Sequence, residues 1–164
     1  NLRKGMYSLD NLWDGLGAIT ILNPEIKYFF GKITMYPSYD TFARDMILYF
    51  MRKYFPDKDN LIVPREPLVL QTREKILRSI FSGANYDEDY KILVQKVRRL
   101  NEGIPPLVNA YMNLSGSMRT FGTAINEQFG MVEETAIMIT IADIYDFKKD
   151  RHISSFKSDP KEKK

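Results

Sequence analysis

The spacing of apolar residues changes along the chain, and this change decides which fold class the sequence can adopt. Over most of the first hundred residues the apolar positions recur every three or four residues, as in Leu9, Leu12, Trp13 and Leu16, which predicts helices with one buried face. From 119 to 141 they alternate instead, which predicts two strands. We therefore predict an α+β domain in which helices flank a mixed sheet.

Breaker residues divide this pattern into elements. Asn23-Pro24 closes a first helix that begins near Met6, and a run rich in aromatic and β-branched residues predicts a strand over 27–36. The remaining predicted elements are a helix from 39 or 40 to 54, a proline-rich loop or edge strand over 57–71, helices over 72–81 and 86–100, a short helix opened by Pro105-Pro106, a hairpin of strands over 119–128 and 131–141, and a helix over 142–151.

One domain accounts for the 164 residues, because a chain of this length can bury an ordinary core. We expect residues 1–156 to form this domain and the Lys-rich residues 157–164 to be a disordered, solvated tail. The first helix and strand lack the strand that would open a strand, loop, helix, strand unit, and the chain starts without Met. The domain is therefore expected to be incomplete at its N-terminus and to lack its N-terminal strands.

Composition excludes several classes of function. The chain has no Cys, and its single His, His152, lies beside the tail, so neither a metal site nor a catalytic triad is expected. A net charge of +3 without a concentrated basic face disfavours nucleic-acid binding. No apolar run approaches the roughly 20 residues of a membrane-spanning helix, and no export signal is visible. The expected location is the cytoplasm.

Two blocks of the sequence resemble a bacterial acyltransferase family. Residues 3–17 and 27–36 resemble the central block of the GNAT-like N-acyltransferases that synthesise glycine and ornithine lipids, a family that includes homologues with a hemolysin label. Residues 104–114 and 121–130 resemble the distal block of the same family. Order and spacing agree from about Arg3 to His152, so the chain looks like the larger, C-terminal part of such an enzyme, and the resemblance implies a GNAT-like fold.

The resemblance implies a reaction and its partners. The enzyme would transfer a 3-hydroxy fatty acyl group from the phosphopantetheine thioester of an acyl carrier protein, or from acyl-CoA, to the amine of glycine or ornithine. The donor would be a substrate, so no permanently bound cofactor is expected. Peripheral contact with the inner membrane face would let the lipid product leave, with the Lys-rich tail near anionic lipid. The alternative is a non-catalytic GNAT-fold module that binds acyl carrier protein or lipid.

The same resemblance places the donor phosphate at the amino end of the first helix. Arg3, Lys4, Gly5, Met6 and Tyr7 occupy the position of the family's phosphate-binding loop, where backbone N–H groups and the helix dipole attract an anion. Met6 stands where the acetyl-CoA pattern has glycine, which puts acetyl-CoA use in doubt. The alternative is that these residues are a solvated terminus.

Few residues are candidates for the catalytic steps. The family's Glu-Leu-Gly-Arg strand, a source of an acid or base, would lie before the first residue. Within the chain we predict Glu134 as the acid or base; its neighbour Glu133 must point to the opposite face of the strand. Asn109 and Tyr111 would orient the acceptor or stabilise the oxyanion, and Asn126 has similar standing. The alternatives are protective charge on an edge strand and satisfied polar groups of the core.

Overall fold

Three antiparallel strands form the centre of the structure, a computed structural model that describes the backbone of residues 2–157 and the side chains of residues 11–151. β1 (Tyr28–Met35) and β2 (Arg119–Asn126) both pair with β3 (Val132–Thr140), which gives the strand order β1-β3-β2. The predicted hairpin is thereby confirmed. The predicted mixed sheet is not seen in the described residues: both strand pairs are antiparallel, and the one parallel contact is the isolated bridge between Pro56 and Thr120.

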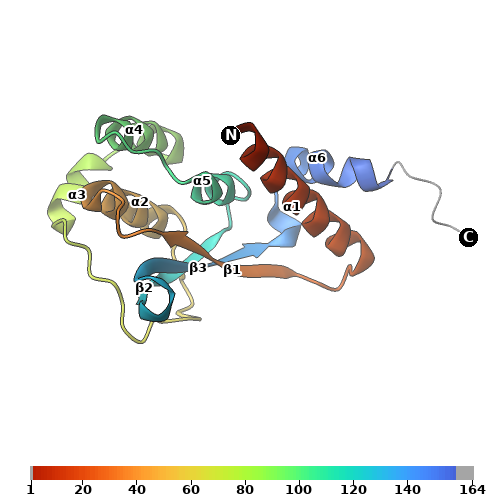
Figure 1. Ribbon diagram of the computed structural model, residues 1–164, viewed down its shortest axis with the longest axis horizontal. Coiled ribbons are helices and arrows are strands. Elements are labelled where there is room, and N and C mark those ends of the chain that lie inside the picture. Colours follow the sequence, from red (N-terminus) through yellow and green to blue (C-terminus); the bar gives the residue numbers. More distant parts are fainter. Residues whose placement is uncertain (1, 158–164) are drawn as a thin grey trace, which may run out of the picture.

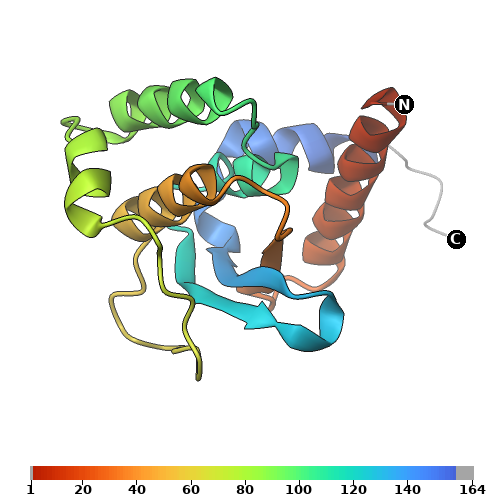
Figure 2. The same ribbon diagram turned by 60° about the vertical axis from the view of Figure 1, so that its left-hand side comes forward.

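Helices lie at both ends of this sheet. Figure 1 shows α2, α3 and α4 grouped near one end, while α1 and α6 lie side by side at the other. Figure 2 shows α1 on the opposite side from α2, α3 and α4 in a second view. The helices of the described chain are α1 (Leu2–Leu22), α2 (Thr41–Tyr54), α3 (Glu74–Ile80), α4 (Tyr86–Arg99), α5 (Pro106–Met112) and α6 (Asp146–Lys157), with single 3-10 turns η1 (Glu127–Phe129) and η2 (Ile141–Asp143).

The core lies between α2 and one face of the sheet, which we call the inner face. α2 begins after Asp40, whose carboxylate accepts a hydrogen bond from Ala43 N at 2.8 Å, and residues 43–51 of the helix are all buried. This cap satisfies a backbone donor that the first turn would otherwise leave free. The inner face of the sheet contributes the buried side chains Ile33, Ile137 and Ile139.

The last helix begins at Asp146 rather than at 142. Ile144 is held in an extended conformation by its bridge to Ser115, and Tyr145 N donates to Leu114 O at 3.2 Å. These long-range contacts prevent the helical conformation that the local sequence favours. The tail predicted for 157–164 starts at the last residue of α6, and residues 158–164 lie outside the described residues.

Residues 57–71, the 57–71 loop, run beside β2 without forming a strand. Its start is fixed by Asp57, whose Oδ2 accepts hydrogen bonds from Leu61 N at 2.6 Å and Ile62 N at 3.3 Å. Leu68 N donates to Thr123 O at 2.8 Å, which joins the loop to the edge of β2. Proline has no N–H to donate, so the prolines of this segment are compatible with a loop and not with a continuous ladder.

A buried ion cluster joins α2, β3 and the end of the 57–71 loop. Arg44 donates to Asp45 Oδ1 from Nε at 3.0 Å and from Nη2 at 2.8 Å, and its Nη1 donates to Glu133 Oε1. Asp45 Oδ2 accepts a hydrogen bond from Thr72 N at 2.6 Å. Burial works against the charge of Arg44, but the bonds to both carboxylates outweigh it and raise its pKa.

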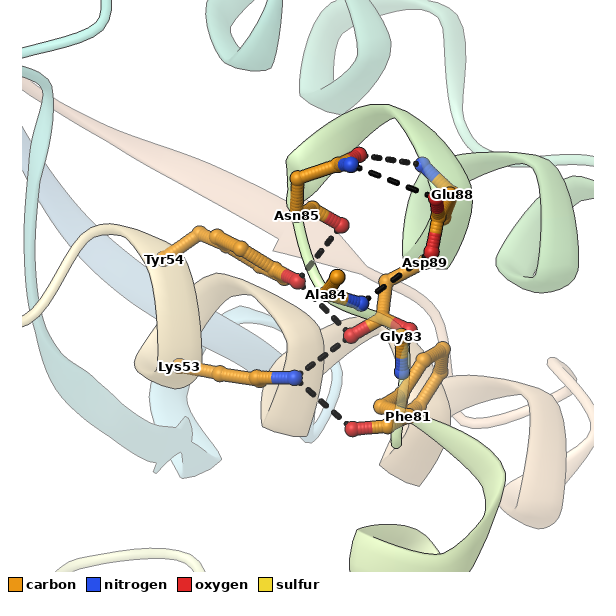
Figure 3. Close-up of polar contacts among 8 residues, drawn as sticks. All are labelled: Lys53, Tyr54, Phe81, Gly83, Ala84, Asn85, Glu88 and Asp89. Atoms are coloured by element: carbon orange, nitrogen blue, oxygen red, sulfur yellow. Dashed lines mark hydrogen bonds and ion pairs between the residues drawn. The ribbon is translucent and has the colours of Figure 1, made fainter.

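A second cluster joins α2 to α4 (Figure 3). The carboxylate of Asp89 is fully buried; its Oδ2 accepts hydrogen bonds from Lys53 Nζ at 2.5 Å and Tyr54 OH at 2.7 Å, and its Oδ1 accepts one from Gly83 N at 2.9 Å. Burial alone would raise the pKa of Asp89, but these bonds outweigh it and hold the pKa below its ordinary value. Lys53 also donates to Phe81 O at 2.7 Å, so the turn before α4 is tied to α2.

This geometry predicts that Gly83→Ala destabilises the protein. An added Cβ would lie 2.5 Å from Asp89 Oδ1, and that carboxylate cannot retreat because Lys53 and Tyr54 hold it. We expect a loss of about 1–3 kcal/mol in the free energy of unfolding, measured by urea denaturation. Gly103→Ala is the control, because nothing lies within 4 Å of its added Cβ, and equal stability of the two variants would contradict the prediction.

Candidate functional site

A polar cleft opens on the outer face of the sheet, the face opposite α2. It has a volume of about 500 Å³. Charged residues from β1, β3, the 57–71 loop and the end of the hairpin meet in it, namely Lys32, Glu134, Glu66 and Glu127. Asn126, at the end of β2, also lines this cleft. A cleft of this size that contains both signs of charge suits a small polar ligand.

Lys32 and Glu134 form the central ion pair of the polar cleft. Lys32 Nζ donates to Glu134 Oε1 at 2.6 Å across the two strands, and the lysine side chain is more exposed than the carboxylate. The hydrogen bond from Lys32 is the main cause that lowers the pKa of Glu134; burial opposes it and Asn126 adds to it. Glu134 is therefore ionised at neutral pH. A good general base needs a pKa near the working pH, and the lowered pKa of Glu134 moves it away from that value. Its carboxylate is therefore better suited to hold an ammonium group than to remove a proton.

An apolar slot lies on the other side of the 57–71 loop. Its volume is about 360 Å³, and its walls come from Leu48 and Met51 of α2, from the loop and from β2. The slot and the polar cleft share part of their lining, namely Ile62, Pro64, Phe121 and Gly122. The two hollows therefore adjoin each other where the loop crosses β2.

The crossing depends on Gly122, which the sequence analysis did not single out. The pairing register of β2 with β3 shifts between Thr120 and Thr123, and Gly122 within this bulge has a φ of 90°. An added Cβ would lie 2.9 Å from Pro64 Cγ. A glycine inside a strand pattern often marks a bulge or a close backbone approach, and this signal was present in the sequence.

Asn109 and Tyr111 do not join Glu134 in the polar cleft. Asn109 lies on α5, accepts a hydrogen bond from Tyr90 OH, and lines a different hollow of about 750 Å³. The ring of Tyr111 packs edge-on against Trp13 of α1 with centroids 5.5 Å apart, and burial raises the pKa of its hydroxyl. Asn109 is thus engaged with Tyr90 and the ring of Tyr111 with Trp13, and a catalytic role for either residue stays a prediction.

Residues 3–7 form the first turns of α1 instead of a loop before it, and the side chains of Arg3, Lys4, Met6 and Tyr7 lie outside the described residues, as does any contact of Gly5. Figures 1 and 2 both show the amino end of α1 well apart from the β2–β3 hairpin. The binding of a phosphate by this segment therefore stays a prediction, separate from the polar cleft.

The described residues contain neither a group of metal-ligating side chains nor a membrane-spanning helix. Over the described residues, no three His, Asp or Glu side chains come together in a way that could hold a metal ion. In the same part of the chain, every helix is too short or too polar to cross a bilayer. The polar cleft with its adjoining slot is the candidate site, because it contains Glu134 and Asn126.

The cleft geometry predicts the titration of Glu134. Lys32→Met removes the hydrogen bond and the nearby positive charge, so the pKa of Glu134 should rise toward its ordinary value, as measured by NMR titration of the side-chain carboxyl. Because the folded-state pKa is lowered, the stabilisation by this pair is present above the ordinary Glu pKa and disappears as the pH falls through the folded-state pKa. Lys75→Met, on α3, is the control; an unchanged Glu134 pKa in Lys32→Met would contradict the assignment.

The sequence is similar to two curated acyltransferases. It is 57% identical over 153 residues to the glycine N(alpha)-acyltransferase of Bacteroides thetaiotaomicron and 59% identical over 153 residues to that of Phocaeicola vulgatus, in both cases across 93% of the chain. No protein-family model matches the chain, and no solved structure matches it significantly. The chain spans about half the length of these relatives, 45% and 47% respectively. Over nearly its whole length, the chain is therefore homologous to part of proteins named glycine N(alpha)-acyltransferase.

Proposed function

We propose that the protein containing this chain transfers an acyl group from a thioester to the amine of glycine. The observation that carries this proposal is the identity of 57% and 59% over 153 residues to two proteins named for glycine N-acylation. In the reaction the amine nitrogen attacks the thioester carbonyl carbon, a C–N bond forms and the C–S bond breaks. The thiol leaves with the proton that the amine loses.

The polar cleft supports glycine as the acceptor. Glycine carries an ammonium and a carboxylate, and the cleft offers the carboxylate of Glu134 beside the ammonium of Lys32. A bound glycine would exchange the existing ion pair for two pairs with the ligand, with Glu66 and Glu127 adding negative charge near its ammonium. Because the pKa of Glu134 is lowered, we assign it to binding of the amine and assign the removal of the proton to another group.

The donor follows from the family resemblance. We infer a fatty acyl thioester on the phosphopantetheine of an acyl carrier protein or on coenzyme A, with its phosphate at the amino end of α1 near Arg3 and Lys4. The acylated amino acid would be a lipid, which accounts for the expected contact with a membrane surface. Ornithine is the competing acceptor, and the names of the two relatives favour glycine.

Glu134→Gln should weaken the binding of glycine in the full-length protein. The substitution keeps the shape of the side chain but removes its charge, so KM for glycine should rise about 10- to 100-fold while kcat changes less. The assay measures N-acylglycine from an acyl thioester by mass spectrometry. Glu74→Gln, at an exposed glutamate of α3, is the matched control. An unchanged KM would sink the role of Glu134, and an ornithine product without a glycine product would sink the choice of acceptor.

The double variant Arg3→Ala/Lys4→Ala tests the donor site separately. Loss of both cations should raise KM for the thioester donor about tenfold and leave KM for glycine unchanged. The matched control is Arg73→Ala/Lys75→Ala, which removes an exposed basic pair near the start of α3. Product formation at the wild-type level over the whole range of donor concentration would refute the role of Arg3 and Lys4.

A further inference from the structure

We propose that the apolar slot binds the hydrocarbon chain of the acyl donor and that its depth sets the preferred chain length. This inference rests on the proposed acyl transfer, since it assigns one part of that reaction's substrate to a place in the structure. It does not depend on where the donor phosphate binds. Its grounds are the chemistry of the slot walls, the exposure of the loop that forms the rim and the position of the polar cleft.

The deep part of the slot offers no free polar group. Met51 and Thr135 are only 1% and 2% exposed. The hydroxyls of Thr123 and Thr135 bond to each other at 2.7 Å, and Thr120 Oγ1 donates to Phe55 O at 2.8 Å. A peptide segment would bring backbone N–H and C=O groups that these walls cannot satisfy, and each unsatisfied group costs free energy. A hydrocarbon chain has no such groups.

Two charged residues line the slot, and both are engaged elsewhere. Asp57 accepts hydrogen bonds from backbone N–H groups of its own loop, as at Leu61 N, and only 8% of its side chain is exposed. Arg52 is 59% exposed, lies 5.5 Å from the ring centroid of Tyr49 and is 3.9 Å from Glu74. Neither charge needs the slot for its interactions. The charged groups of the lining are thus already paired, and the rest of the lining is mostly apolar.

The loop at the rim presents aliphatic side chains to solvent. Ile62 and Val63 both line the slot, and they are 39% and 72% exposed respectively. The loop is held in place by Asp57 at its start and by the bond from Leu68 N to Thr123 O, so these side chains stay at the surface. Clustered exposed apolar residues are typical of binding surfaces. A chain that enters beside Val63 would cover part of this surface.

The polar cleft lies where the reacting end of such a chain would emerge. Ile62, Phe121 and Gly122 belong to both hollows, so the slot adjoins the cleft that contains Lys32 and Glu134. An acyl chain in the slot would therefore bring its thioester carbonyl toward the amine of a glycine in the cleft. Holding two reactants side by side in this way is a major source of catalytic rate.

The test uses the full-length protein and the fatty acids octanoate, dodecanoate and hexadecanoate, with affinities measured by isothermal titration calorimetry. Binding should tighten about fourfold for each methylene that enters the slot and stop improving when the slot is full. Val63→Trp places an indole at the slot and should weaken dodecanoate binding at least about tenfold. Val69→Trp is the matched control, because this valine is similarly exposed, at 79% against 72% for Val63, and lines neither hollow. Ile62→Trp replaces Val63→Trp if the latter does not fold.

The outcomes distinguish failure of the acyl-chain slot from failure of the proposed acyl transfer. Equal dodecanoate affinity in Val63→Trp and Val69→Trp overturns the slot, as does dodecanoate that binds no tighter than octanoate, because the added methylenes would then not be buried. The same variants are then assayed for N-acylglycine with thioesters of the three chain lengths. A shift of Val63→Trp toward shorter chains supports the slot. Wild-type protein that binds dodecanoate but forms no N-acylglycine overturns the reaction and not the slot.

Discussion

The buried ion cluster of Arg44, Asp45 and Glu133 is the interaction on which the arrangement of the candidate site depends. It fixes α2 against β3 through the contact of Arg44 with Glu133, and it fixes the end of the 57–71 loop through the bond from Thr72 N to Asp45. Loss of one member would leave a buried charge without its partner, which typically costs about 3–5 kcal/mol. Because the loop divides the apolar slot from the polar cleft, the same cluster helps to fix the position of the wall that the two hollows share.

Local patterns in the sequence predicted most of the elements, because their causes are local. The apolar stripe and the cap at Asp40 define α2, and the alternating residues after Val132 define β3. Alternation also predicted that Glu133 and Glu134 lie on opposite faces, and the structure confirms it: Glu133 meets Arg44 in the core, while Glu134 meets Lys32 in the cleft. The alternation of side chains along a strand is enough to place one of two neighbouring carboxylates in the core and the other at the surface.

The location of the site could not be predicted in this way, because it depends on contacts between distant segments. The 57–71 loop shows no period of its own, and its path is set by the bond to Thr123, the bond to Asp45 and the close approach of Pro64 to Gly122. Each of these joins residues that are far apart in the sequence. The chemistry of the side chains was visible beforehand, as for Glu134, but their meeting in one cleft required the folded chain.

The exposed aliphatic side chains of the 57–71 loop link stability to function. A loop that only connected α2 with α3 would gain nothing by presenting Ile62 and Val63 to water while tying its backbone to Asp57 and to β2. A loop that must receive an apolar chain gains affinity from this arrangement. The binding surface is already formed, and the entropy cost of ordering the loop is met during folding and not on binding. Preorganisation of this kind favours selection of the acyl group by shape, with the cleft beside it selecting the amine by charge.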